Sequence, residues 1–196
     1  MAYEMDGIKN MKKDSYVSKE ERWILMGIPA LFVIGSLFHF LYPLSGENFL
    51  VGLIAPVNES VWEHTKMVVI PVILWWSIYY IVHHREDTID KRKWFSAELV
   101  ALLTAILSIP LLYYFYTEAF GVELLWVDIL ILALAVLAGQ LIGLHVYRHG
   151  KGVNANIVIL IILIIVVLYF TFTIAPLKLP IFQNPIDGSY GIKKSR

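Results

Sequence analysis

Five long apolar stretches dominate this chain of 196 residues. They cover residues 23–42, 60–82, 95–114, 124–145 and 157–174. An α-helix needs about 20 residues to cross the hydrocarbon core of a bilayer. Backbone groups in hydrocarbon must be hydrogen-bonded within their own segment, and no alternating strand pattern is present, so each stretch is predicted to be a transmembrane helix. A further apolar run, residues 49–55, is too short to span and is expected to lie at the interface or to re-enter the membrane.

The composition agrees with a membrane protein. Hydrophobic residues make up 58% of the chain and charged residues 16%, whereas a soluble domain averages roughly 45–50% apolar and about 25% charged residues. This balance excludes a soluble domain, a disordered chain and a nucleic-acid-binding module. The chain has no cysteine, which excludes disulfides, iron–sulfur clusters and thiolate zinc sites. We therefore expect an all-α, multi-pass bundle of the cell membrane, with the lipid bilayer around it and a second copy or another membrane protein as a candidate partner.

Lys and Arg are unevenly distributed among the segments that flank the apolar stretches. Eleven of them fall in the N-terminal segment and in the loops after the second and fourth stretches, whereas the opposite loops hold only Lys66. Positive residues collect on the cytoplasmic side, so the N-terminus is predicted to be cytoplasmic. The chain then divides into a cytoplasmic segment 1–22, a five-helix membrane domain 23–175 and a Pro-rich extracytoplasmic tail 176–196. The tail carries four further Lys and Arg residues, so a chain with one span fewer and a cytoplasmic tail is the alternative.

Small residues mark a contact between two of the predicted helices. They recur every four positions in the third and fourth stretches, at Ala97, Ala101 and Ala105 and at Ala135, Gly139 and Gly143. Such stripes let helix backbones approach closely in a membrane. We expect the third and fourth helices to pack together in antiparallel orientation. The fifth helix, almost wholly Ile, Val and Leu, is expected to face lipid.

The most unusual segment is 56–66, with the sequence Pro-Val-Asn-Glu-Ser-Val-Trp-Glu-His-Thr-Lys. Charged groups beside a membrane span are costly and point to function. On a helix, Glu59 and Glu63 would share a face because they are four residues apart, and His64 lies next to Glu63. These three residues are the candidate catalytic groups, able to supply acid–base chemistry.

A structural interpretation of the same segment is also open. Ser60 and Glu63 fit a capping box, in which each side chain bonds a backbone N–H at the start of a helix. Glu63 and Lys66 have the spacing of an ordinary ion pair within a helix. Capping explains Ser60 and Glu63, but it leaves Asn58, Glu59 and His64 without a reason to stand together.

Metal binding is a second hypothesis for this end of the bundle. His39 lies near the outer end of the first predicted helix, and Asp128 lies about one turn into the fourth. With His64 and Glu63, these residues are candidate ligands for a divalent ion such as zinc. Their spacing matches no established metal motif. Paired histidines also suit haem b, but no other feature favours it and we do not expect haem.

The segment 56–66 resembles the signature of an uncharacterised family of small bacterial and archaeal multi-pass membrane proteins. The resemblance extends to His39-Phe40-Leu41-Tyr42 and to Asp187-Gly188-Ser189-Tyr190-Gly191-Ile192, where Ser189 departs slightly from the pattern. It covers residues 23–192. The family is a domain of unknown function, so the resemblance implies a membrane fold and no catalytic assignment.

Three functions remain open, and whether the chain is an enzyme is undecided. The first is a binding or accessory protein with an outer polar pocket for a solute, lipid or ion, formed around Asn58 to Lys66. The second is a membrane-embedded acid–base or metal-dependent enzyme that acts on a lipid-linked substrate. The third is a small transporter or a transporter subunit, although no internal repeat is present. The tail after residue 175 is expected either to fold over the outer mouth of the bundle or to be a loose end.

Overall fold

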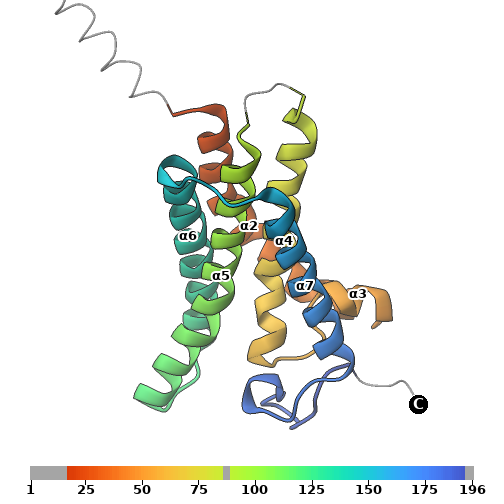
Figure 1. The fold of residues 1–196 in the computed structure, drawn as a ribbon. Helices are drawn as coiled ribbons and strands as arrows, with labels where there is room; N and C mark the ends of the chain where they lie inside the picture. Colours follow the sequence, from red (N-terminus) through yellow and green to blue (C-terminus); the bar gives the residue numbers. More distant parts are fainter. Residues whose placement is uncertain (1–16, 86–88, 193–196) are drawn as a thin grey trace, which may run out of the picture.

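The computed structural model describes residues 17–85 and 89–192, and within these ranges the chain is helical apart from its loops and one isolated β-bridge (Figure 1). The helices are α2 (Lys19–Leu44), α3 (Phe49–Ile54), α4 (Val61–His83), α5 (Lys91–Phe120), α6 (Leu125–His149), α7 (Ala155–Ile174) and the short 3-10 helix η1 (Pro180–Phe182). Five of them, all except α3 and η1, are long and apolar enough to cross a membrane. The predicted all-α bundle with five spans is therefore confirmed.

Most of these helices extend beyond the apolar stretches that predicted them, because polar residues at their ends continue the helix. At the start of α5, the Asp90 carboxylate caps the helix by accepting from the Arg92 and Lys93 backbone N–H groups. At its end, Gly121 adopts a left-handed conformation with φ of 65°, which glycine accepts without steric cost. The short apolar run at 49–55 forms α3, which has six residues and cannot span.

Parts of the predicted domain organisation lie outside the described residues. These are residues 1–16 of the expected cytoplasmic segment and residues 193–196 of the expected tail. The cytoplasmic position of the N-terminus stays a prediction.

The expected pair of neighbouring helices is present as the α5–α6 hairpin. Gly139 lies directly against α5, and a Cβ atom at this position would come within 2.7 Å of the Ala101 carbonyl oxygen. Gly143 similarly faces Ala97 and Ala101. Small residues at this contact therefore set the distance between the two helices.

The two ends of the bundle contain different parts of the chain. We call one of them the motif end: the start of α4, the α5–α6 loop and the tail after α7 gather there, at the bottom of Figure 1. At the opposite end, Trp23 of α2 stacks on Trp75 of α4 with ring centroids 4.2 Å apart. Each indole N–H also donates to the other residue's carbonyl, at 3.1 and 3.2 Å. This reciprocal pair fixes α2 against α4.

Helix α7 lies on one side of the bundle. Much of its surface consists of exposed apolar residues, and its contact with lipid stays a prediction. It also has one buried face, formed by Val158, Ile162, Tyr169 and Thr173. Through Tyr169 and Thr173, α7 reaches the start of α4, where the conspicuous polar segment lies.

Candidate functional site

Helix α4 begins with a side-chain cap. Ser60 is the N-cap residue, and its hydroxyl accepts a hydrogen bond from the Glu63 backbone N–H at 3.3 Å. The Ser60 backbone N–H donates to the Asn58 side chain at 2.9 Å. Glu63 instead accepts from the Val57 backbone N–H at 3.0 Å. The half of the expected capping box that involves the Ser60 side chain is thus present. In the other half, the Glu63 carboxylate accepts from the Val57 backbone N–H and not from that of Ser60.

Glu63 forms a buried ion pair with Lys66. The Glu63 Oε2 and Lys66 Nζ atoms are 2.6 Å apart, and their side chains are only 2% and 1% exposed. The Lys66 ammonium also donates to the carbonyl oxygens of Gly52 and Ala55, and the Thr173 hydroxyl donates to Glu63 Oε1. This pair therefore joins α3, the loop before α4, α4 itself and α7.

Asn58 holds the tail to the same end of the bundle. Its side-chain amide donates to the Gly191 carbonyl at 3.2 Å, and the Ile192 backbone N–H donates to the Thr173 carbonyl at 3.0 Å. Of the two expectations for the tail, its described part follows the first, because it folds back over the motif end. Its residues Pro185 and Ile186 line the pocket described below.

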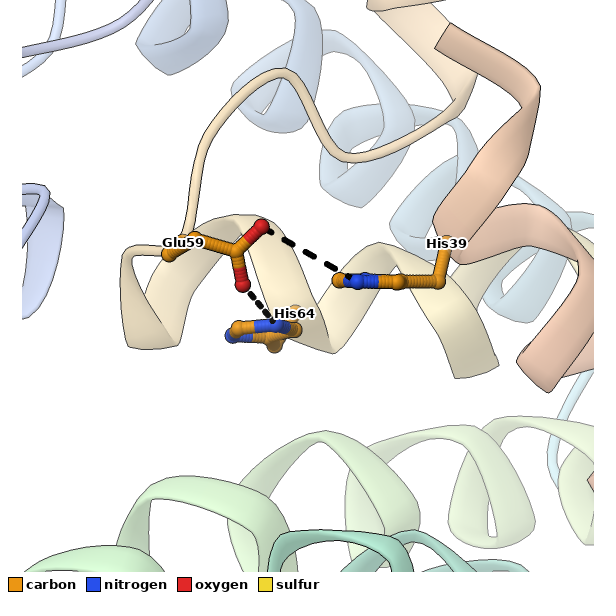
Figure 2. Close-up of side chains that lie close together, drawn as sticks. All are labelled: His39, Glu59 and His64. Atoms are coloured by element: carbon orange, nitrogen blue, oxygen red, sulfur yellow. Dashed lines mark ion pairs between the residues drawn. The ribbon is translucent and has the colours of Figure 1, made fainter. Parts of the chain in front are cut away.

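The remaining polar residues of the segment meet a histidine from another helix. Figure 2 shows the Glu59 carboxylate beside two imidazole rings, with a dashed line to His64 at the start of α4 and another to His39 near the end of α2. The Glu59 oxygens lie 3.2 Å from His64 Nε2 and 3.9 Å from His39 Nε2. The two rings are nearly parallel, with centroids 5.4 Å apart. We call these three residues the His–Glu–His cluster.

Glycine brings the helices that carry this cluster together. A Cβ atom at Gly35 of α2 would come within 2.5 Å of the Met67 carbonyl of α4. His39 lies about one turn along α2 from Gly35, and His64 lies about one turn along α4 from Met67. The close contact at Gly35 therefore sets the separation of the two imidazoles.

The cluster has a charged, half-buried character. The side chains of His39, Glu59 and His64 are 29%, 41% and 30% exposed. The interaction with His64 lowers the pKa of the Glu59 carboxyl below its usual range, despite the opposing effect of partial burial. Glu59 is therefore ionised at neutral pH and available to an imidazolium or a metal ion.

The His–Glu–His cluster lies in a pocket of about 580 Å³ at the motif end. Helices α2 and α4 form one wall, and α5 and α6 form the other. Most of the lining is apolar: Phe40, Val61, Met67, Ile109, Leu125, Ile129, Ile131, Leu132, Pro185 and Ile186. The pocket therefore combines a largely apolar interior with a polar group on its α2–α4 wall.

The α5–α6 side of the pocket carries two carboxylates, each paired with a tyrosine. The Tyr116 hydroxyl donates to Asp128 Oδ1 at 2.7 Å, and the Tyr113 hydroxyl donates to Glu123 Oε1 at 2.6 Å. Asp128, Glu123 and Tyr113 line the pocket. No motif in the sequence singles out Tyr113 and Tyr116 among the 11 tyrosines of the chain.

The structure separates residues that are neighbours in the sequence pattern. Of the candidate catalytic residues, it places Glu59 and His64 side by side in the pocket and Glu63 in the buried ion pair. Of the candidate metal ligands, His39 and His64 meet, Asp128 lines the same pocket beside Tyr116, and Glu63 does not line it. The carboxylate next to the two imidazoles therefore belongs to Glu59 and not to Glu63.

These features define a small polytopic α-helical membrane protein with a mixed apolar and polar pocket at one end of the bundle. The chain belongs to a family of unknown function, DUF6512, whose model matches residues 11–192. No curated protein and no solved structure matches the chain.

Proposed function

We propose that this protein is a binding protein of the cell membrane whose pocket takes up a lipid-like molecule with a hydroxyl-bearing head. The pocket itself carries this proposal. Its volume of about 580 Å³ lies within the roughly 300–1,000 Å³ typical of small-molecule sites, which are mostly apolar with a few polar groups that orient the ligand.

The lining suggests how such a molecule would lie. Its apolar part would contact Ile109, Ile129 and Leu132, and its head would reach the polar groups on either side. Glu59 and Asp128 present carboxylate oxygens, which accept hydrogen bonds and so favour a head that donates them. A lipid bilayer is an abundant source of molecules with this division between apolar and polar parts.

The proposal is tested with a fluorescent monoacylglycerol, which has an acyl chain and two free hydroxyls, added to the purified protein in detergent. Ile129 lines the pocket and is 48% exposed, so Ile129→Trp narrows the pocket without overfilling the core. The next residue, Leu130, is 46% exposed and lies outside the lining, so Leu130→Trp is the matched control. We expect saturable binding that is weakened at least about tenfold by Ile129→Trp only. Equal binding by both variants would contradict the proposal.

A further inference from the structure

We propose that the His–Glu–His cluster is a zinc-binding site. The inference rests on the proposed function in one respect, because the ion would lie at the polar end of the same pocket. One ligand atom from each of His39, Glu59 and His64 lies within 4.8 Å of the other two (Figure 2).

The spacing of the ligand atoms suits zinc. Zinc bonds to imidazole nitrogen and carboxylate oxygen are about 2.0–2.2 Å long, and tetrahedral geometry then separates the ligand atoms by about 3.3–3.6 Å. Glu59 Oε2 lies 3.2 Å from His64 Nε2, and the other carboxylate oxygen, Oε1, lies 3.9 Å from His39 Nε2. With one ligand atom taken from each residue, all three lie within 4.8 Å of one another. Small rotations of partly exposed side chains would bring all three ligand atoms to the coordination distance.

The types of donor also point to zinc. Two imidazoles and one carboxylate form the protein ligand set of several zinc sites, with a fourth position left for water or another molecule. Imidazole is a poor ligand for magnesium, which prefers oxygen donors and keeps several of its waters. Because all three side chains line the pocket, the fourth position of the ion would be open to whatever the pocket contains.

The neighbouring charges leave the cluster free for a cation. Lys66, the ammonium group of the same segment, is bound to Glu63 and to two carbonyl oxygens. Asp128 faces the pocket from the other wall and adds a further negative charge near the site. The polar segment thus separates into a pair that stabilises the fold and a cluster that can accept an ion.

The experiment is a zinc titration of the purified protein in detergent, in competition with a chromophoric chelator. We expect one zinc ion per chain, and no comparable binding of magnesium. Removing a residue that only supports a metal ligand commonly weakens metal binding by 10–100-fold. Loss of a ligand itself should cost at least as much, so we expect His39→Ala, His64→Ala and Glu59→Gln each to weaken zinc binding by about 100-fold or more. Thermal unfolding of each variant checks that it is folded.

A second histidine pair provides the control. His145 and His149 lie at the opposite end of the bundle with ring centroids 4.7 Å apart, a spacing that can also attract zinc. His145→Ala should leave the stoichiometry and affinity unchanged. Zinc binding that is lost in His145→Ala, unaffected by all three cluster variants, or matched by magnesium would overturn the inference.

X-ray absorption at the zinc edge gives a test that does not depend on variants. Two imidazoles and oxygen ligands at about 2.0–2.2 Å are expected for the wild-type protein, and a shell without imidazole would overturn the inference. The two proposals fail separately. Absence of zinc binding with retained monoacylglycerol binding rejects the zinc site alone, whereas Ile129→Trp should weaken lipid binding and keep the zinc.

Discussion

Glu63 and Lys66 form an ion pair within the first turn and a half of α4, and neither side chain exposes more than 2% of its surface. A buried charge without its partner is costly, and removing one member of such a pair destabilises a protein by about 3–5 kcal/mol. Val57, Thr173 and Lys66 satisfy the hydrogen-bonding capacity of the Glu63 carboxylate oxygens. This arrangement explains Glu63 and Lys66 as parts of the fold.

Glu63→Gln should therefore lower the free energy of unfolding by about 3–5 kcal/mol, because Lys66 would be left buried and unpaired. Thermal or SDS-induced unfolding of the purified protein measures this. Glu59→Gln is the matched control, since Glu59 is 41% exposed and its loss should cost less than about 1 kcal/mol. The double variant Glu63→Leu with Lys66→Met should recover part of the loss, because it removes both charges. Equal stability of the two single variants would contradict the structural role.

The sequence predicted the composition of this site better than its geometry. Placing Glu59 and Glu63 on one helical face assumed that both belong to the helix, but α4 begins only at Val61, after the N-cap Ser60. The rule that residues four apart share a face therefore does not apply to them. Their carboxylates go to different places, one into the pocket and one into the buried ion pair. The contact between His39 and His64 depends on how α2 crosses α4 at Gly35, which no local pattern specifies.

The membrane spans were predictable because hydrocarbon imposes helix on every long apolar stretch. The α5–α6 contact was predictable for a related reason, since small residues at a fixed spacing have few other uses in a membrane helix. The tail contact cannot be predicted from the sequence, because the residues that hold it, such as Asn58 and Gly191, are far apart in the chain and follow no periodic pattern.

The close approach of α5 and α6 at Gly139 predicts a cost for any larger side chain. Gly139→Leu should destabilise the protein by about 1–3 kcal/mol, because its Cβ would come within 2.7 Å of a backbone oxygen that cannot easily move. The measurement is thermal unfolding in detergent. Leu137→Phe enlarges a side chain that is 38% exposed on the same helix and should have little effect. An unchanged unfolding temperature for Gly139→Leu would count against the contact.

Glu98 of α5 supplies a test of a different kind. It is 1% exposed, and its Oε2 atom has no hydrogen-bond partner among the described residues. A buried carboxyl group without a partner is costly when it ionises, so Glu98→Gln, which keeps the shape and cannot ionise, should leave stability unchanged or raise it by up to about 1–3 kcal/mol. Glu118→Gln on the exposed end of α5 is the control. A marked loss of stability in Glu98→Gln would mean that the ionised carboxylate is needed.

The tail is predicted to depend on an aromatic contact. Phe182 of η1 packs against Trp62 of α4 with ring centroids 4.8 Å apart and is 5% exposed. Phe182→Ala should remove about 3 kcal/mol of local stabilisation and speed amide hydrogen exchange at residues 184–192 by about 100-fold. Ile186→Ala, at a side chain that is 77% exposed, is the matched control. Exchange that is equally slow in both variants would show that hydrogen bonds hold the tail without the Phe182 contact.

The last prediction concerns the side of the membrane that the pocket faces. Lys91 and Glu118 are exposed residues near opposite ends of α5, and Glu118 lies toward the motif end, where the pocket is. The positive residues of the flanking loops predict that Lys91 is cytoplasmic and Glu118 external. Because the chain has no cysteine, Lys91→Cys and Glu118→Cys each introduce a unique thiol for an impermeant reagent in intact cells. We expect labelling of Glu118→Cys in intact cells and of Lys91→Cys only after the membrane is opened, which would make the pocket accessible to external zinc. The reverse pattern would turn the pocket toward the cytoplasm.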